Sequence, residues 1–128
     1  MSAARQRTGR LAESLVAEQL RDAGWEILAR NARTSEVRGE LDLIALDGPD
    51  LVFVEVKARR AGTSSGPETP AMAVGARKRA KLRSLATAWL RDAGSGVPRH
   101  RALRFDVVGI RLDARGRARE YEHLRAAF

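Results

Sequence analysis

The sequence contains no cysteine, only two histidines, and few aromatic residues, which make up 5% of the chain. Without cysteine, disulfide scaffolds, thiolate zinc sites and cysteine nucleophiles are excluded. His100 and His123 lack the paired spacing of a metal-binding helix, so we expect both on the surface. Scarce aromatic residues argue against single-strand binding by base stacking, and we expect Trp25 and Trp89 to be core or interface anchors.

The sequence also lacks a long apolar run, because the longest are only a few residues and fall far short of a membrane span. Glu13 and Glu18 follow the basic N-terminus where a signal peptide would need an apolar stretch. A glycine-rich nucleotide loop is absent, and Ser64 and Ser65 have no convincing base nearby in sequence. We therefore expect a cytoplasmic protein with no membrane partner, and neither a nucleotide-binding loop nor a serine hydrolase has support.

Basic residues, in contrast, are in excess. The chain of 128 residues has 24 Lys and Arg against 16 Asp and Glu, a formal net charge of +8. Such a surplus favours a polyanion as partner, nucleic acid first and acidic membrane surface second. Coding bias in an Ala- and Arg-rich chain explains the excess equally well, so composition does not decide. The length and the 44% apolar content fit one domain spanning residues 1–128.

Apolar periodicity predicts two long helices and several strands. Helical spacing covers residues 7–23 and 71–93, and a glycine follows each segment. Strands are predicted over residues 25–30, 41–46, 51–56 and 104–112, with a weaker one over 119–123. Residues 47–50 are typical of a hairpin turn, and residues 59–70 of an exposed, mobile loop. This order indicates an α/β fold with a mixed sheet flanked by helices.

Charged side chains interrupt the apolar residues of the predicted hairpin. By strand alternation, Glu40 and Asp42 share one face of the first strand, and Glu55 and Lys57 share one face of the second. If the strands pair symmetrically about the 47–50 turn, Asp42 lies opposite Glu55 and Glu40 lies opposite Lys57. Directly opposed residues have Cβ atoms roughly 4.5 to 5.5 Å apart, so two carboxylates would meet on one side of the sheet.

Facing carboxylates repel unless something compensates, and a divalent cation would do so. Mg²⁺ or Mn²⁺ usually binds through one or two carboxylates plus waters and substrate phosphate. Lys57 would point to the same place, where its ammonium either stabilises charge on a phosphate or positions and deprotonates an attacking water. An ordinary Glu40–Lys57 ion pair beside a solvated strand face fits the same pattern, so the residues alone leave both interpretations open.

Each predicted helix carries a charged residue next to its apolar stripe. Glu13 lies at the margin of the first stripe and could reach an adjacent site. Lys78 lies within the apolar face of the second helix, where it either faces a bound phosphate or extends past the core edge to solvent. Asp106 is expected to pair with Arg104 or Arg111 and not to act in catalysis.

A series of short motifs runs along nearly the whole chain, from about Gly9 to Phe128. They are Gly9 with Ala12 and Glu13, then Gly24, Trp25, Ile27, Leu28 and Asn31, and then the segments GELDLIA, FVEVKAR, AVGARK and RFDV. In this order the motifs resemble the YraN family of small bacterial proteins. One departure is Ser65 before Gly66, where the family often has an aromatic residue.

The YraN family is similar to archaeal Holliday-junction resolvases and belongs to the PD-(D/E)xK, or restriction-endonuclease-like, superfamily. The resemblance implies a three-layer α/β fold with a mixed central sheet. It also implies that Asp42, Glu55 and the backbone carbonyl of Val56 hold Mg²⁺ or Mn²⁺. Lys57 and the helical acid Glu13 match the remaining catalytic positions.

The activity implied is metal-dependent hydrolysis of phosphodiester bonds in structured or branched DNA, with water attacking phosphorus in line. Arg59 and Lys78 are expected to contact the nucleic-acid backbone. A homodimer is compatible with the analogy to the resolvases, because two sites related by a twofold axis could cut two strands. The alternatives are a non-catalytic nucleic-acid-binding module and a protein-interaction domain on the same fold.

Overall fold

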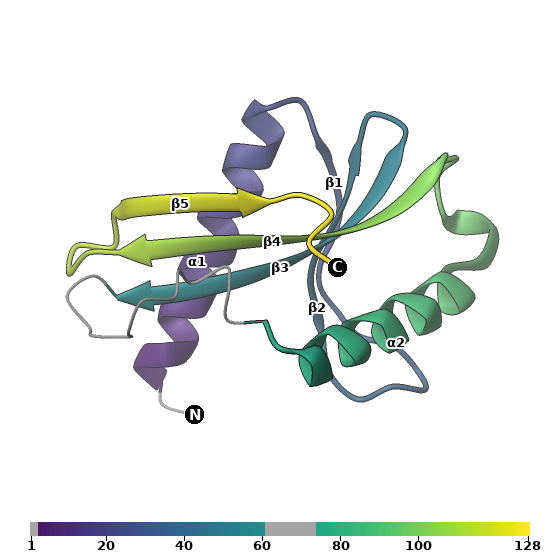
Figure 1. Cartoon of the computed structure of the whole chain (residues 1–128), viewed down its shortest axis with the longest axis horizontal. Coiled ribbons are helices and arrows are strands. Elements are labelled where there is room, and N and C mark those ends of the chain that lie inside the picture. Colours follow the sequence, from purple (N-terminus) through teal and green to yellow (C-terminus); the bar gives the residue numbers. More distant parts are fainter. Residues whose placement is uncertain (1–2, 61–73) are drawn as a thin grey trace.

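The computed structural model describes residues 3–60 and 74–128 of the chain (Figure 1). The elements in these residues are α1 (Ala3–Asp22), β1 (Glu26–Ala32), β2 (Leu41–Asp47), β3 (Asp50–Arg60), α2 (Ala76–Ala93), the short 3-10 helix η2 (Gly94–Gly96), β4 (Ala102–Leu112) and β5 (Ala118–Leu124). None of the helices in this part of the chain is long and apolar enough to cross a membrane.

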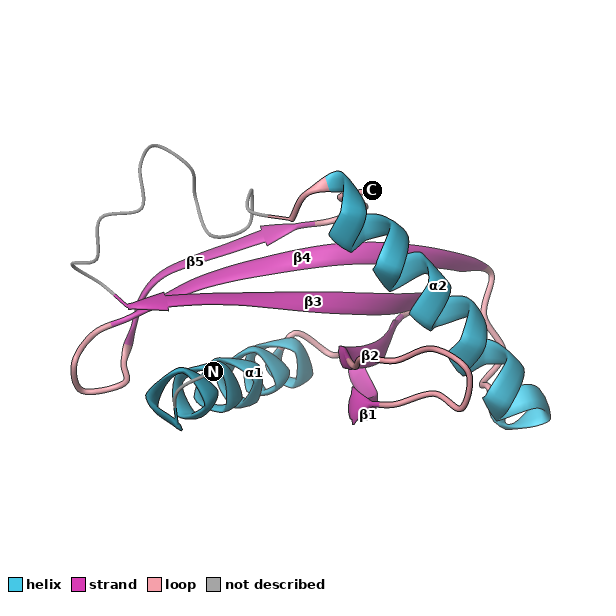
Figure 2. Ribbon diagram, turned by 90° about the horizontal axis from the view of Figure 1, so that it is seen from below, coloured by secondary structure: helices cyan, strands magenta, loops and turns pink. Residues whose placement is uncertain are grey.

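The strands form one mixed sheet in the order β1-β2-β3-β4-β5. β3 and β4 run parallel, and the other neighbours are antiparallel. Figure 2 shows α1 on one face of this sheet and α2 on the other. The predicted α/β fold, a mixed sheet flanked by helices in three layers, is therefore confirmed.

Each helix covers its own half of the hydrophobic core. On the α1 face, Val16 and Leu20 pack with Trp25 against buried strand residues such as Val52. On the α2 face, the buried cluster comprises Leu41, Ile44, Leu51, Phe53, Val74, Leu82, Leu85, Ala86 and Val107, with Trp89 packed against it. Both tryptophans thus have the packing role predicted for them.

Several elements extend beyond the ranges that the sequence pattern predicts. α1 starts at Ala3, and β3 continues to Arg60, because its last residues pair with β4 in a parallel ladder that ends at Arg60 and Leu112. Arg59, which was predicted to begin an exposed loop, is therefore part of β3 and pairs with Arg111 of β4. The rest of that predicted loop, residues 61–70, lies outside the described residues, and so do residues 71–73 of the predicted second helix.

The β2–β3 ladder ends before β3 does. Leu46 pairs with Leu51, as predicted, and the pairs continue only to Leu43 and Val54. From Glu55 onward, β3 keeps β4 on one side, while β2 no longer pairs with it on the other. This open stretch of strand edge positions the candidate site.

Candidate active site

Asp42 lies at the point where β2 leaves β3. Its Oδ2 atom accepts a hydrogen bond from the backbone N–H of Val56 at 2.9 Å. In a β-strand the N–H and C=O of one residue point to the same edge, so the Val56 carbonyl also faces the edge occupied by Asp42. Asp42 and the Val56 carbonyl, both predicted from the sequence as metal ligands, therefore share one strand edge.

Three carboxyl groups lie in a row at this edge, with Asp42 in the middle. The carboxyl groups of Glu13 and Glu55 both interact with that of Asp42 by hydrogen bonding. Glu13 comes from α1 and is 8% exposed, and Glu55 comes from β3 and is 5% exposed. The facing pair expected from strand alternation, Asp42 and Glu55, is thus brought together, and Glu13 reaches it from the neighbouring helix.

Burial and mutual repulsion raise the pKa values of Asp42 and Glu13 in this row. Burial raises the pKa of Asp42 to about 7, and the charge of Glu55 and hydrogen bonding to it add to the effect. Burial also raises the pKa of Glu13, although a hydrogen bond from Asn31 opposes that rise. The row therefore retains a proton up to about neutral pH.

Two lysines approach Glu55 from different elements. Lys57 Nζ of β3 lies 3.9 Å from Glu55 Oε2, and Lys78 Nζ of α2 lies 3.5 Å from the same oxygen. Their side chains are 33% and 44% exposed, so each ammonium touches the carboxylate and solvent together. Lys78 therefore does more than extend past the core edge, because it brings α2 into the site.

The predicted ion-pair alternative for Glu40 is wrong. Glu40 Oε1 pairs with Arg33 Nη2 at 2.7 Å, and Lys57 turns to Glu55. The reason is geometric: the β2–β3 ladder ends at Leu43, so the register does not carry Glu40 to a position opposite Lys57. Arg59 lies two residues beyond Lys57 on the same face of β3 and is half-buried.

Sequence reasoning assigned no role to Asn31, which positions Glu13. Its Nδ2 donates a hydrogen bond to Glu13 Oε2 at 2.9 Å, and its backbone has a positive φ of 50°. Asparagine tolerates this left-handed conformation better than most residues. Asn31 directly follows the strand predicted over residues 25–30 and is one of the motif residues, which was the only signal for it in the sequence.

His123 was predicted on the surface, and that prediction is wrong. Its Nε2 lies 2.7 Å from Oδ2 of the fully buried Asp106, and its ring lies 5.5 Å from that of Trp25. β5 pairs along β4 and so carries His123 over Asp106, a contact between elements that sequence spacing does not reveal. The predicted Arg104–Asp106 pair is confirmed at 2.9 Å, and His100 is exposed as expected.

The oxygen atoms available at this site fit a hard divalent cation that takes only a few of its ligands from the protein. Within residues 3–60 and 74–128, no three or more His, Asp or Glu side chains are grouped around a point where they could hold a metal ion. Asp42, Glu55 and the Val56 carbonyl instead supply two carboxylates and one carbonyl, which would leave other positions to water and phosphate, as Mg²⁺ prefers. A cation there would relieve the repulsion that raises the pKa of Asp42.

Comparison with known proteins places this chain in a family. The sequence profile of an uncharacterised protein family, UPF0102, matches residues 12–110. A UPF0102 protein of Rhodococcus jostii is 47% identical over 116 residues, covering 91% of each chain. UPF0102 proteins of Moorella thermoacetica and Acidothermus cellulolyticus are 38% and 42% identical, over 100% and 99% of this chain and 100% and 97% of their own. The chain therefore belongs to the UPF0102 family, which is the YraN family named from its motifs.

Proposed function

We propose that this protein is a metal-dependent nuclease that hydrolyses phosphodiester bonds in structured or branched DNA. The observation that carries the proposal is the meeting of Asp42 and Glu55 at an open strand edge, with two lysine ammonium groups on Glu55. A purely structural strand face would not need to bury repelling carboxylates and raise a pKa to about 7. The match of Asp42, Glu55 and Lys57 to the PD-(D/E)xK pattern supports the same reaction.

The placement of lysine supports a functional interpretation of the site. Among the 24 basic residues of the chain only Lys57, Lys78 and Lys81 are lysines, and the rest are arginines. Lys57 and Lys78 contact Glu55. Lys81 packs against Gly39, which lies three residues before Asp42, and a Cβ at Gly39 would be 3.5 Å from Lys81 Cε. Two of the three lysines of this arginine-rich chain thus place their compact ammonium groups at Glu55.

Each residue has a specific task in the proposed reaction. Asp42, Glu55 and the Val56 carbonyl would hold Mg²⁺ or Mn²⁺, which when bound acidifies a water and neutralises phosphate charge. Lys57 donates to a non-bridging oxygen of the scissile phosphate or to the attacking water, and Lys78 binds the adjoining phosphate.

Glu13 accepts a proton or a hydrogen bond from the attacking water and is oriented for this by Asn31. The water oxygen bonds to phosphorus and the opposite P–O bond breaks, so the leaving oxygen gains a proton. Arg59, two residues beyond Lys57 on the same face of β3, contacts the nucleic-acid backbone next to the scissile phosphate. Two copies related by a twofold axis would cut two strands of a branched substrate symmetrically, in the cytoplasm.

A second candidate is a non-catalytic nucleic-acid-binding module, which the net charge of +8 favours. One experiment separates the two. Labelled duplex, single-stranded, flap and four-way-junction DNAs are incubated with Mg²⁺ or Mn²⁺ and with wild type, Asp42→Asn, Glu55→Gln or Glu26→Gln protein. Glu26 is an exposed carboxylate on the edge strand β1 and serves as the matched control.

The proposal predicts that wild type and Glu26→Gln cut at least one DNA, that chelation stops cutting, and that Asp42→Asn and Glu55→Gln lose at least about a hundredfold in rate. Equal cutting by all four proteins would identify a contaminant and remove the assigned roles. Binding without cutting by all four would establish the binding module instead.

A further inference from the structure

The positive charge of the chain is unevenly placed. Three stretches, residues 3–11, 57–60 and 111–120, together contain ten basic and two acidic side chains. Their net charge of +8 equals that of the whole sequence, so the remaining residues are neutral in sum. We call these three stretches the arginine end of the molecule, since nine of the ten basic residues are arginines.

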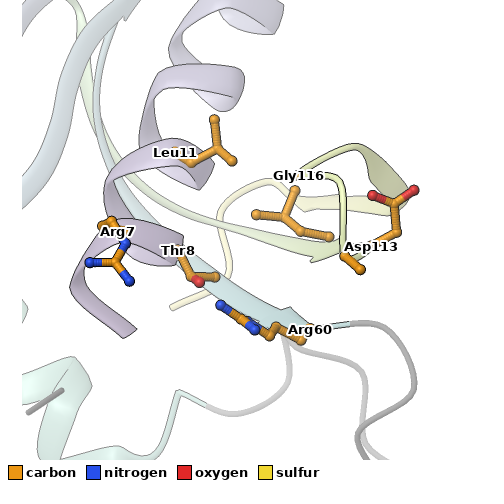
Figure 3. A pocket seen from close by; sticks show the side chains of 8 residues that line it. Arg7, Thr8, Leu11, Arg60, Asp113 and Gly116 are labelled. Atoms are coloured by element: carbon orange, nitrogen blue, oxygen red, sulfur yellow. The ribbon is translucent and has the colours of Figure 1, made fainter. Parts of the chain in front are cut away.

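The fold brings these stretches together. In Figure 2 the first turns of α1, the end of β3 and the β4–β5 turn lie at the same end of the molecule. A pocket of about 250 Å³ opens where they meet (Figure 3). Its lining comprises Arg7, Thr8 and Leu11 of α1, Arg60 of β3, and Leu112, Asp113, Ala114 and Gly116 of the turn.

The one acid in this lining is already used within the turn. Asp113 accepts hydrogen bonds from the backbone N–H groups of Arg115 and Arg117 at 2.8 and 2.9 Å, and from Arg119 Nε at 2.9 Å. Figure 3 shows its carboxylate pointing away from Arg7 and Arg60. Its charge is therefore balanced locally, and the electrostatic character of the pocket is set by the two guanidinium groups.

The rest of the pocket is shaped by close packing. Leu11 lies so near Gly116 that a Cβ there would be 2.9 Å from Leu11 Cδ2, and Gly116 has a φ of 77° that a side chain would rarely adopt. This contact holds the turn against α1 and keeps the opening between Arg7 and Arg60 in place. Two planar guanidinium forks beside a short apolar wall suit one phosphate with its attached sugar.

We infer that the arginine end, which begins at Lys57 beside the acidic row, binds the backbone of nucleic acid beyond that row, with Arg7 and Arg60 holding one phosphate in this pocket. This inference deepens the proposed function. The relation of the pocket to a cut rests on the proposed nuclease activity, whereas binding at the pocket does not. An acidic membrane would also be attracted by the charge. However, Leu11 is the only large exposed apolar side chain of the described pocket lining, which is too little for stable insertion.

The position of the pocket bears on the length of substrate that can reach both sites. Arg60 follows Glu55 by five residues on β3, which at about 3.3 Å per residue is roughly 16 Å along the strand. Because this spacing is odd, the two side chains lie on opposite faces of the sheet, so a substrate held at both sites must extend past the cut and cannot follow β3 in a straight line.

The test measures binding without cleavage. Fluorescence anisotropy follows a labelled 20-base-pair duplex in EDTA across a range of salt, with wild type, an Arg7→Gln and Arg60→Gln double variant, and Arg99→Gln. Arg99 is an exposed arginine before β4 and is the matched control. Loss of the one phosphate held by these two side chains should weaken binding by about tenfold or more at about 0.1 M salt and flatten the log–log salt slope by roughly one. Arg99→Gln should change the affinity by less than about twofold, and circular dichroism should show all three folded.

Wild-type affinity and slope in the double variant would overturn the inference, and so would an equal loss in Arg99→Gln. Preferential binding to phosphatidylserine vesicles, lost in the double variant, would also overturn it, because the occupant would then be a membrane. The two proposals fail separately. If the double variant loses binding while no protein cuts DNA, the binding surface stands and the nuclease does not; if Glu55→Gln alone loses cutting and the double variant binds normally, the reverse holds.

Discussion

The carboxylate of Asp42 accepts a hydrogen bond from the Val56 amide at 2.9 Å, although the backbone pairing of their strands ends at Leu43 and Val54. A side chain thus takes the place that strand backbone would occupy at the edge of β3. The arrangement satisfies an otherwise open N–H group and holds a buried carboxyl against Glu55. The consequences of that placement are testable in the protein without metal.

The first prediction concerns pH. Because the pKa of Asp42 is raised from 3.8 to about 7 by folding, the folded state binds a proton that the unfolded chain has lost between these values. The contribution of Asp42 to the free energy of unfolding is therefore most favourable below about pH 4 and is lost as the pH rises to about 7. The raised pKa of Glu13 changes the stability in the same direction. Urea unfolding in EDTA should show wild type less stable at about pH 8 than at about pH 5, by about 2–4 kcal/mol.

Asp42→Asn is the control for this pH effect, because an amide cannot ionise. Its stability should change much less between the same two pH values. A wild-type protein that is more stable at the higher pH would contradict the buried, repelling arrangement of the acidic row.

Asn31→Gly tests whether positioning of Glu13 matters. Glycine accepts the positive φ of 50° and removes only the amide that donates to Glu13, so the fold should lose no more than about 1 kcal/mol. Cleavage should fall by about tenfold or more while duplex affinity stays within about twofold. Asn31→Asp, which replaces the donor by an acceptor, should be worse than Asn31→Gly; equal activity in all three proteins would remove Asn31 from the site.

The Asp106 cluster is predicted to hold the fold and not the reaction. Asp106 is fully buried and accepts hydrogen bonds from Arg104, His123 and the Ala126 amide. Burial alone would raise its pKa, but these bonds outweigh burial and lower it. Asp106→Asn should cost about 1–3 kcal/mol, because the amide nitrogen cannot accept the buried hydrogen bonds that the carboxylate accepts, although Arg104 keeps Asp47 and Asp50 as partners. The exposed Asp22→Asn, measured by the same urea melts, should change stability by less than about 0.5 kcal/mol.

The C-terminal residues are predicted to hold the first turns of α2. The Phe128 ring stacks on Phe105 at 5.1 Å, and the guanidinium groups of Arg79 and Arg83 lie 5.6 and 5.3 Å from its centre. Phe128→Ala should speed backbone hydrogen exchange around Lys78, because α2 has no side-chain N-cap to hold its start. Phe128→Tyr should retain wild-type exchange rates. Equal exchange in Phe128→Ala and wild type would show that the ring does not anchor the helix.

The sequence predicted best what depends on neighbours along the chain. The hairpin register from Leu46 and Leu51 follows from a short turn, and it carries Asp42 to Glu55. Where the ladder stops is a property of the whole sheet, and for that reason Glu40 was placed opposite Lys57 when it pairs with Arg33.

Contacts between distant elements were the hardest to predict. The helix pattern showed that Glu13 borders the apolar stripe. The approach of α1 to Asp42, and the contact of Glu13 with Asn31 of β1, depend on how the helix docks on the sheet. His123 was misplaced for the same reason, because only the pairing of β5 with β4 brings it to Asp106. Lys78 was singled out because a charge in an apolar helix face is visible in sequence, and its ammonium lies 3.5 Å from Glu55.

The most direct test of the account is titration of the protein with Mn²⁺ by calorimetry at about pH 6.5, in two buffers that differ in ionisation enthalpy. The account predicts one bound ion per chain and release of up to about one proton, because Asp42 is largely protonated there before the ion binds. Asp42→Asn should abolish both, and Glu26→Gln should leave both unchanged. No binding at millimolar Mn²⁺, or undiminished binding by Asp42→Asn, would contradict a cation site built on Asp42 and Glu55.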